Sequence, residues 1–118
     1  MKKKLCFDID GVICKTEGSN YSKSKPYRKA IKLINELYDS GHTIIIFTAR
    51  YMGRNSENQK KAYAQGYNRT YKQLKKWDLK FHKLIMGKPS YDIFVDDKSF
   101  GFNKNWLKKF RYNFKKEL

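Results

Sequence analysis

The sequence predicts an α/β fold, a three-layer Rossmann-like arrangement around a parallel sheet of about four strands. Short apolar runs alternate with helical patterns through most of the chain, as repeated βαβ units do. The run at 43–47 is almost continuously β-branched, which is typical of a strand buried on both faces. The length of 118 residues favours one domain, residues 1–118.

The individual elements follow from local signals. Four segments predict strands: 3–8, 43–47, 84–86 and 91–95. Three segments predict helices: one after Pro26 that ends at Ser40-Gly41, one over 56–77 in which Gly66 is a candidate break, and one from Asn103 onward with Trp106, Leu107 and Phe110 facing inward. Residues 15–25 are polar and without period, so we expect a functional loop there.

We expect the strands to lie in the order 4-1-2-3. The chain then winds one way through three strands and reverses to place 91–95 beside 3–8. Sheets of this kind bind ligands at such a reversal, beyond the carboxyl ends of the strands. Asp8 ends the first strand and Asp10 follows it, and Asp96 and Asp97 follow the last. The topology therefore predicts that these four carboxylates meet.

A cluster of carboxylates is unfavourable unless a cation lies among them. The chain has a net charge of +16, so this cluster would be a local exception. Carboxylate oxygens suit a hard ion, and Mg²⁺ is the predicted cofactor. The other two strands also end in polar groups, Thr48-Ala49-Arg50 and Gly87-Lys88-Pro89.

In this order, the four motifs resemble those of the haloacid dehalogenase (HAD) superfamily of phosphohydrolases. That family has Asp-x-Asp at the first strand, Thr or Ser at the second, then a Lys, then an acidic pair. The match spans residues 5–97. The resemblance implies a capless HAD core, because only 12–25 and 51–69 stand where other members insert a cap domain, and either stretch is a candidate lid.

The resemblance also implies roles for individual residues. Asp8 would be the nucleophile that forms an aspartyl-phosphate, and Asp10 the general acid and base. Thr48 would hold phosphoryl oxygens and Lys88 would neutralise charge. The Mg²⁺ ligands would be the Asp8 carboxylate, the Asp10 backbone carbonyl and Asp97, with Asp96 orienting them or taking the place of Asp97. The expected substrate contacts are Thr48, Ala49, Arg50, Tyr51 and Arg54, with Tyr21 as a further candidate.

The short core is similar to small capless members associated with bacterial surface-polysaccharide biosynthesis, which implies a sugar or polyol phosphate as substrate. A polynucleotide 3′-phosphatase or a basic nucleic-acid-binding protein on the same scaffold is an alternative. A receiver domain is disfavoured because its acidic pair comes first in the chain. A nucleotide-sugar transferase using Asp-x-Asp leaves Lys88 and the pair Asp96-Asp97 without a role.

Composition bears on partners and location. The basic residues are 22 Lys and 5 Arg. Proteins that recognise phosphates and nucleic-acid bases favour Arg. The charge therefore predicts general attraction of anions more than nucleic-acid recognition. No apolar stretch has the length of a membrane span or a signal peptide, and Cys6 and Cys14 have no metal-like spacing. We therefore expect a cytoplasmic protein with reduced thiols. His42 and His82 precede strands, and we expect no catalytic role for them.

Overall fold

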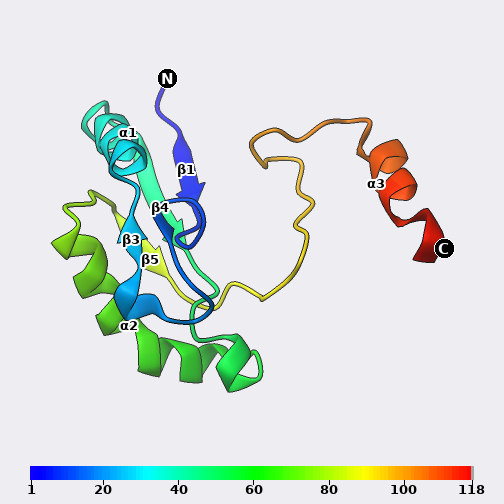
Figure 1. Cartoon of the computed structure of the whole chain (residues 1–118). Coiled ribbons are helices and arrows are strands. Elements are labelled where there is room, and N and C mark those ends of the chain that lie inside the picture. Colours follow the sequence, from blue (N-terminus) through cyan, green and yellow to red (C-terminus); the bar gives the residue numbers. More distant parts are fainter. Residues whose placement is uncertain (118) are drawn as a thin grey trace.

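The sheet of this protein has three parallel strands. The computed structural model describes residues 1–117, so Leu118 of the predicted domain lies outside the described residues. The strands are β1 (Lys4–Phe7), β4 (Thr43–Phe47) and β5 (Lys83–Ile85), in the order β1-β4-β5. The α/β class with a parallel sheet is thus confirmed (Figure 1).

Two helices cover this sheet and complete the core. They are α1 (Arg28–Asp39) and α2 (Gln59–Lys76). α1 begins two residues after Pro26, which itself belongs to a short strand. The helices bury their apolar faces against the strands, through residues such as Ile31, Ile34, Ile44, Ile46, Ala62 and Leu74. The core thereby fixes the carboxyl ends of the three strands on one side of the body.

The polar stretch after β1 folds into a small hairpin. Its strands β2 (Cys14–Lys15) and β3 (Lys25–Pro26) pair antiparallel, and the 3₁₀ turn η1 (Tyr21–Lys23) lies between them. The ring of Tyr21 packs against Tyr51, with ring centroids 5.0 Å apart. The predicted loop is therefore an ordered flap that lies beside the strand ends.

Gly66 does not divide α2, which continues unbroken through it. A Cβ atom at this position would lie 2.2 Å from the ring of Tyr51. Tyr51 itself has a φ of 69°, in the left-handed region that costs a non-glycine residue energy. The glycine thus makes room for the Tyr51 ring on the helix surface.

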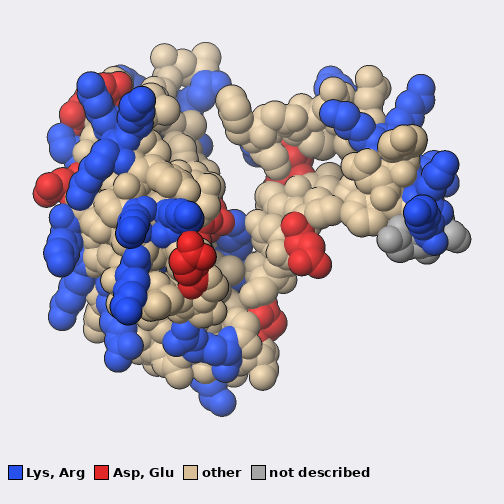
Figure 2. All heavy atoms as spheres, viewed as in Figure 1, with Lys and Arg blue, Asp and Glu red and all other residues tan. Residues whose placement is uncertain are grey.

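Residues 91–117, which we call the arm, extend away from the body formed by residues 1–90. Figures 1 and 2 show the arm standing off from the body. The radius of gyration is 15.8 Å, against about 13.5 Å for a compact chain of this length. Residues 91–95, which the sequence predicts as the fourth strand, form no strand among the described residues. The order 4-1-2-3 therefore lacks its first member within this chain.

The helix of the arm has no core to face. α3 (Trp106–Phe114) contains no buried residue, and Leu107 is 64% exposed. The prediction that Trp106, Leu107 and Phe110 face inward is therefore wrong for this chain. Trp106 and Phe110 pack on one another instead, with ring centroids 6.0 Å apart. The helix ends in the 3₁₀ turn η3 (Lys115–Glu117).

Candidate active site

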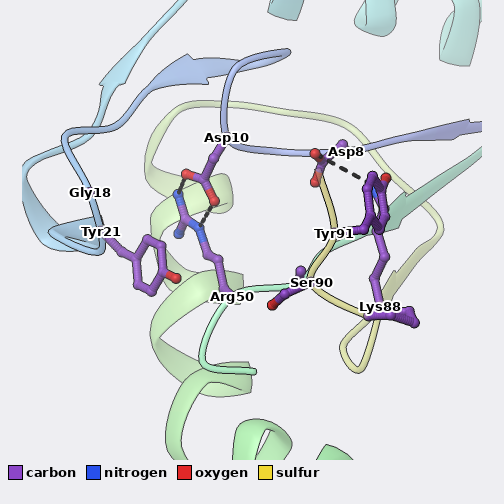
Figure 3. A pocket seen from close by; sticks show the side chains of 10 residues that line it. Asp8, Asp10, Gly18, Tyr21, Arg50, Lys88, Ser90 and Tyr91 are labelled. Carbon is purple, nitrogen blue, oxygen red and sulfur yellow. Dashed lines mark hydrogen bonds and ion pairs between the residues drawn. The ribbon is translucent and has the colours of Figure 1, made fainter. Parts of the chain in front are cut away.

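A pocket opens where the three strands end. Figure 3 shows side chains from β1's end, β4's end, the flap and the segment after β5 converging on it. The lining residues are Asp8, Asp10, Gly18, Tyr21, Ala49, Arg50, Lys88, Pro89, Ser90 and Tyr91. Three of the four predicted catalytic residues therefore meet in one place, with Ala49 and Arg50 beside them.

Asp8 and Lys88 face one another across this pocket. Asp8 directly follows β1, and the amide of Ile9 donates to its Oδ1 at 2.8 Å. The Lys88 Nζ lies 3.4 Å from the other oxygen, Oδ2. Burial alone would lower the pKa of Lys88, but Tyr91 and the Asp8 carboxylate outweigh it and raise that pKa. Lys88 is therefore a permanent cation beside the carboxylate.

The backbone around Lys88 fixes its position. Gly87 has a φ of +92°, a conformation that only glycine adopts without strain. Just after this turn, the Lys88 amide donates to the Thr48 carbonyl at 3.2 Å. The side-chain amide of Gln59 donates to the Gly87 carbonyl at 3.1 Å. The end of β5 is thus tied to the end of β4 and to α2.

Asp10 is held by a bidentate ion pair. The Arg50 Nε donates to Asp10 Oδ2 and the Arg50 Nη2 to Oδ1, both at 2.9 Å. The hydroxyl of Thr16, in the flap, also donates to Oδ1. Burial raises the pKa of Asp10, but the hydrogen bonds from Arg50 and Thr16 outweigh it, so the pKa is lowered below its usual value. Asp10 is therefore ionised in the free protein.

Arg50 is itself almost completely buried, at 2% exposure. Its Nη1 donates to Gln73 Oε1 at 2.6 Å, and its guanidinium lies 4.7 Å from the centroid of the Tyr21 ring. The predicted substrate contact is thus mainly the partner that orients Asp10. Gln73 and Tyr21 hold it in turn, since the Gln73 amide donates to the Tyr21 carbonyl at 2.7 Å.

Thr48 is the predicted catalytic residue that does not line the pocket. It is 0% exposed, and its hydroxyl oxygen accepts the Arg50 amide at 3.1 Å. Its own amide donates to the Ile85 carbonyl, which extends the pairing of β4 with β5. In the free protein Thr48 therefore stabilises the turn that presents Ala49 and Arg50.

A second, cationic pocket adjoins the first and shares Tyr21 and Arg50 with it. Its further lining residues are Ser19, Asn20, Ser22, Tyr51, Arg54, Arg69, Thr70, Lys72, Gln73 and Lys76, with no carboxylate among them. Arg54 places its guanidinium 4.6 Å from the Tyr51 ring centroid and donates to the Ser19 carbonyl at 3.1 Å. The predicted contacts Tyr51 and Arg54 thus belong to this neighbouring pocket.

Several residues of these pockets were not predicted from the sequence. Arg69, Lys72 and Gln73 lie on the polar face of α2, where such residues ordinarily only meet solvent. Cys14 is buried with its Sγ 3.5 Å from Asp10 Oδ1, and burial raises its pKa, so it stays a thiol. Thr16 belongs to a polar stretch without any pattern. None of these carries a local signal, because only the folded flap and helix bring them to Asp10.

The acidic pair Asp96-Asp97 lies on the arm and does not line the pocket of Asp8. The amide of Lys98 donates to Asp96 at 2.9 Å and lowers the pKa of Asp96. Within residues 1–116, no three side chains of the His, Cys, Asp and Glu types come together as a metal-binding group. The chain thus brings together Asp8, Asp10 and Lys88 but not the second carboxylate pair.

Comparison with known proteins gives one full-length structural neighbour. This is the crystal structure of a structural-genomics target from Vibrio cholerae, which is 27% identical in sequence. The alignment covers 100% of both chains with a TM-score of 0.76. No protein-family model and no curated protein matches this chain.

The described residues contain no helix that is both long and apolar enough to cross a membrane. Lysine and arginine side chains are spread over the visible face of the body and occur on α3 as well, as Figure 2 shows. On that face they do not gather into a single stripe.

Proposed function

We propose that this protein is a phosphomonoesterase of the HAD type in which Asp8 is the nucleophile. The pairing of Asp8 with Lys88 in an open pocket, Nζ to Oδ2 3.4 Å, carries the proposal. A carboxylate that attacks a phosphate monoester must approach another anion. A fixed ammonium beside it reduces the repulsion and stabilises charge on the phosphoryl oxygens.

The reaction would take two steps. An Asp8 oxygen forms a bond to phosphorus while the bond from phosphorus to the ester oxygen breaks, and the leaving alcohol takes a proton. Water then attacks the aspartyl-phosphate and releases inorganic phosphate and the Asp8 carboxylate. Asp10 takes the proton from that water, a role that suits the ionised state in which Arg50 holds it.

Asp10 would also give a proton to the leaving oxygen in the first step. This half of its role needs a protonated carboxyl, which the bidentate bond from Arg50 disfavours. We therefore expect Arg50 to loosen one of its two bonds when the substrate phosphate enters and competes for the guanidinium. Ala49 and Tyr21 line the same entrance and would contact the substrate.

Mg²⁺ would assist by neutralising charge between the substrate and Asp8. Asp8 and Asp10 both line the pocket. The Asp8 carboxylate and the Asp10 backbone carbonyl would hold the ion, and oxygen is the donor type that Mg²⁺ prefers. Mg²⁺ in such sites keeps several waters and binds substrate phosphate. The remaining protein ligand would be Asp97, oriented by Asp96, once residues 91–95 occupy the fourth place in the order 4-1-2-3.

The adjoining cationic pocket supports a substrate with polar groups beyond the phosphate. Arg54, Arg69 and Lys72 can donate to hydroxyl or anionic oxygens, which suits a sugar or polyol phosphate of surface-polysaccharide biosynthesis. The same cations would also accommodate a polynucleotide, so a 3′-phosphatase is the second candidate. The free thiols Cys6 and Cys14 suit a cytoplasmic enzyme.

A phosphate-release screen tests the proposal. The wild-type chain with Mg²⁺ is assayed against sugar, polyol and nucleotide phosphates and a 3′-phosphorylated oligonucleotide. Asp8→Asn should abolish release, whereas Asp39→Asn should not, because Asp39 pairs with Lys80 on the exposed surface. Full activity of Asp8→Asn would refute the nucleophile. Affinity that falls steeply with salt would favour the oligonucleotide over the sugar phosphates.

A further inference from the structure

Strand β1 has an unused edge. Among residues 1–117, β1 pairs with β4 alone, so its outer edge presents backbone groups without a strand partner. Unpaired edges bind other strands readily unless they are covered or blocked. The Asp8 pocket lies at the carboxyl end of this edge. A strand added here would therefore end beside the proposed nucleophile.

The arm contains a segment of strand character that has no partner in its own chain. Residues 91–95 read Tyr-Asp-Ile-Phe-Val, rich in the β-branched and aromatic residues that strands favour. Ile93, Phe94 and Val95 are all exposed, Phe94 by 56%. Within the described chain, the backbone and side chains of residues 92–116 form hydrogen bonds only with one another. An apolar strand segment is thus held out in solvent.

This segment cannot pair with its own β1 in a way that brings Asp97 to Asp8. The backbone of Lys88 lies beside the end of β4, and its side chain reaches Asp8 at the carboxyl end of β1. Tyr91, the first residue of the segment, already lines the same pocket. A parallel strand must start at the opposite end of β1, about 13 Å away, and no residues are left between the pocket and the segment to cover that distance. Parallel neighbours normally need a connection of about a dozen residues.

An antiparallel return along the same edge fails for a different reason. It would carry the acidic pair to the amino end of β1, away from the pocket. The acidic pair of one chain therefore has no short route to the pocket of that chain.

We propose that residues 91–95 add to β1 of a second copy of this chain, and that two copies exchange arms reciprocally. Each arm strand then runs parallel to the partner's β1 and ends with its acidic pair beside the partner copy's Asp8. The sheet in each half acquires the fourth strand that the sequence predicts. The chemistry of the completed site rests on the proposed function. The exchange of arms does not.

A two-fold axis permits this exchange without a long connection. The two β1 strands run antiparallel in such a dimer, with both arm strands between them as one continuous sheet. Each arm strand then starts at the pocket end of its own β1 and runs back beside the partner's β1, two strand spacings or about 9.6 Å to the side. The arm therefore needs no long connection, whereas parallel pairing within one chain does.

Exchange would also give the rest of the arm a surface to cover. α3 carries Trp106, Leu107 and Phe110 with no core of its own, and Tyr112 is exposed as well. In the dimer these side chains can lie on the partner's sheet beside the added strand. Each active site would then consist of Asp8, Asp10 and Lys88 from one copy and Asp96 and Asp97 from the other.

The molecular mass of the full chain is the first test. Light scattering should give twice the chain mass of 14.1 kDa at micromolar concentration. Ile93→Asp puts a charge on the exchanged strand and should shift the protein to the monomer, whereas Lys104→Asp, outside the strand, should not. A wild-type chain that is monomeric at every concentration overturns the proposal.

A disulfide between chains with different nitrogen isotopes distinguishes an exchange of arms from a dimer in which the two chains only lie side by side. When Asp96 lies opposite Asp8 in the parallel pair, residue 94 lies opposite the exposed Cys6, at a Cα spacing that a disulfide can bridge. Phe94→Cys chains with ¹⁴N and ¹⁵N are mixed, unfolded, refolded and oxidised. About half of the linked peptides joining positions 6 and 94 should carry one label from each chain. Linked peptides of a single label only would overturn the proposal, and Cys6→Ser should remove the linkage.

Complementation then tests the shared site. Asp8→Asn and Asp97→Asn should each be inactive as homodimers. Refolded together in equal amounts, they should recover about a quarter of wild-type activity, because half of the dimers contain one intact site. If the mixed-label disulfide forms but activity does not recover, the exchange of arms is supported and the shared active site is refuted. Absence of phosphate release by the wild-type chain would refute the proposed function, and the mass and the disulfide would still decide the exchange.

Discussion

Two segments of this chain have nearly the same local pattern and different structures. Leu5-Cys6-Phe7 lies in strand β1 and is followed by Asp8, whereas Ile93-Phe94-Val95, followed by Asp96, stays exposed on the arm. The connection explains the difference. Between β1 and β4 lie the flap and the whole of α1, which carry the chain back for a parallel pair. After β5 only a few residues precede the second segment. A strand pattern therefore forms a strand only where the connection lets it reach an edge.

The largest expected effect separates Asp8 of the body from an exposed acid of the arm. Asp8→Asn should lower kcat for phosphate release by roughly 10³-fold or more, because it removes the attacking group. Asp92→Asn, an exposed acid in the arm, is the matched control and should retain activity. The measurement is steady-state turnover of the best substrate from the screen. Equal losses of kcat in the two variants would mean that Asp8 of the body is no more important for turnover than Asp92 of the arm.

The ion pair of the body should matter most for stability. Asp10→Ala leaves the buried Arg50 guanidinium without its partner, and we expect a loss of about 3–5 kcal/mol in the free energy of unfolding. Asp39→Ala breaks the exposed pair with Lys80 and should cost less than about 1 kcal/mol. Urea unfolding followed by circular dichroism measures both. Similar values for the two variants would contradict the difference in burial.

Asp96 should act on the metal without touching the substrate. Asp96→Asn should weaken Mg²⁺ binding by about 10–100-fold, as loss of a group that orients a ligand does, with little change in kcat at saturating Mg²⁺. Activity titrated against Mg²⁺ gives both quantities, and Asp92→Asn serves again as the control. If Asp96→Asn needed the same Mg²⁺ concentration as the wild type, Asp96 of the arm would have no part in the metal site.

Gly66 should tolerate no larger side chain. Gly66→Ala places a methyl group against the Tyr51 ring, and we expect a destabilisation of about 1–3 kcal/mol. Ala64→Gly, at an exposed position of the same helix, should cost about 1 kcal/mol through helix propensity alone. Thermal unfolding compares the two. A stabilised Gly66→Ala would show that the ring moves aside freely.

The smallest expected effect is a dependence of stability on pH. The folded pKa of Asp10 is lowered below the unfolded value of about 3.9, so its contribution is complete above that pH and is lost as the pH falls through the folded pKa. The wild type should therefore lose more stability than Asp10→Asn on acidification below about pH 4. Unfolding at a series of pH values measures the two slopes, and parallel curves would contradict the assigned direction.

Much of the body could be predicted from the sequence. The β-branched run predicted over 43–47 is β4 at those bounds, and the other two strands lie within a residue or so of prediction. Asp8 and Lys88 were expected at one site because strand ends of a parallel sheet lie on the same side, and they do meet. Periodicity and turn residues suffice for such inferences, since both act over a few neighbours.

The sequence alone determined the strands of the body, the helices that cover them, and the position of Asp8 at a strand end, because hydrophobic period and β-branching act locally. Only the tertiary structure decided that Arg50 holds Asp10, that Thr48 is buried behind the pocket, and that residues 91–95 have no edge within their own chain. Those outcomes depend on contacts between distant residues and on the reach of one short connection, which no local pattern encodes.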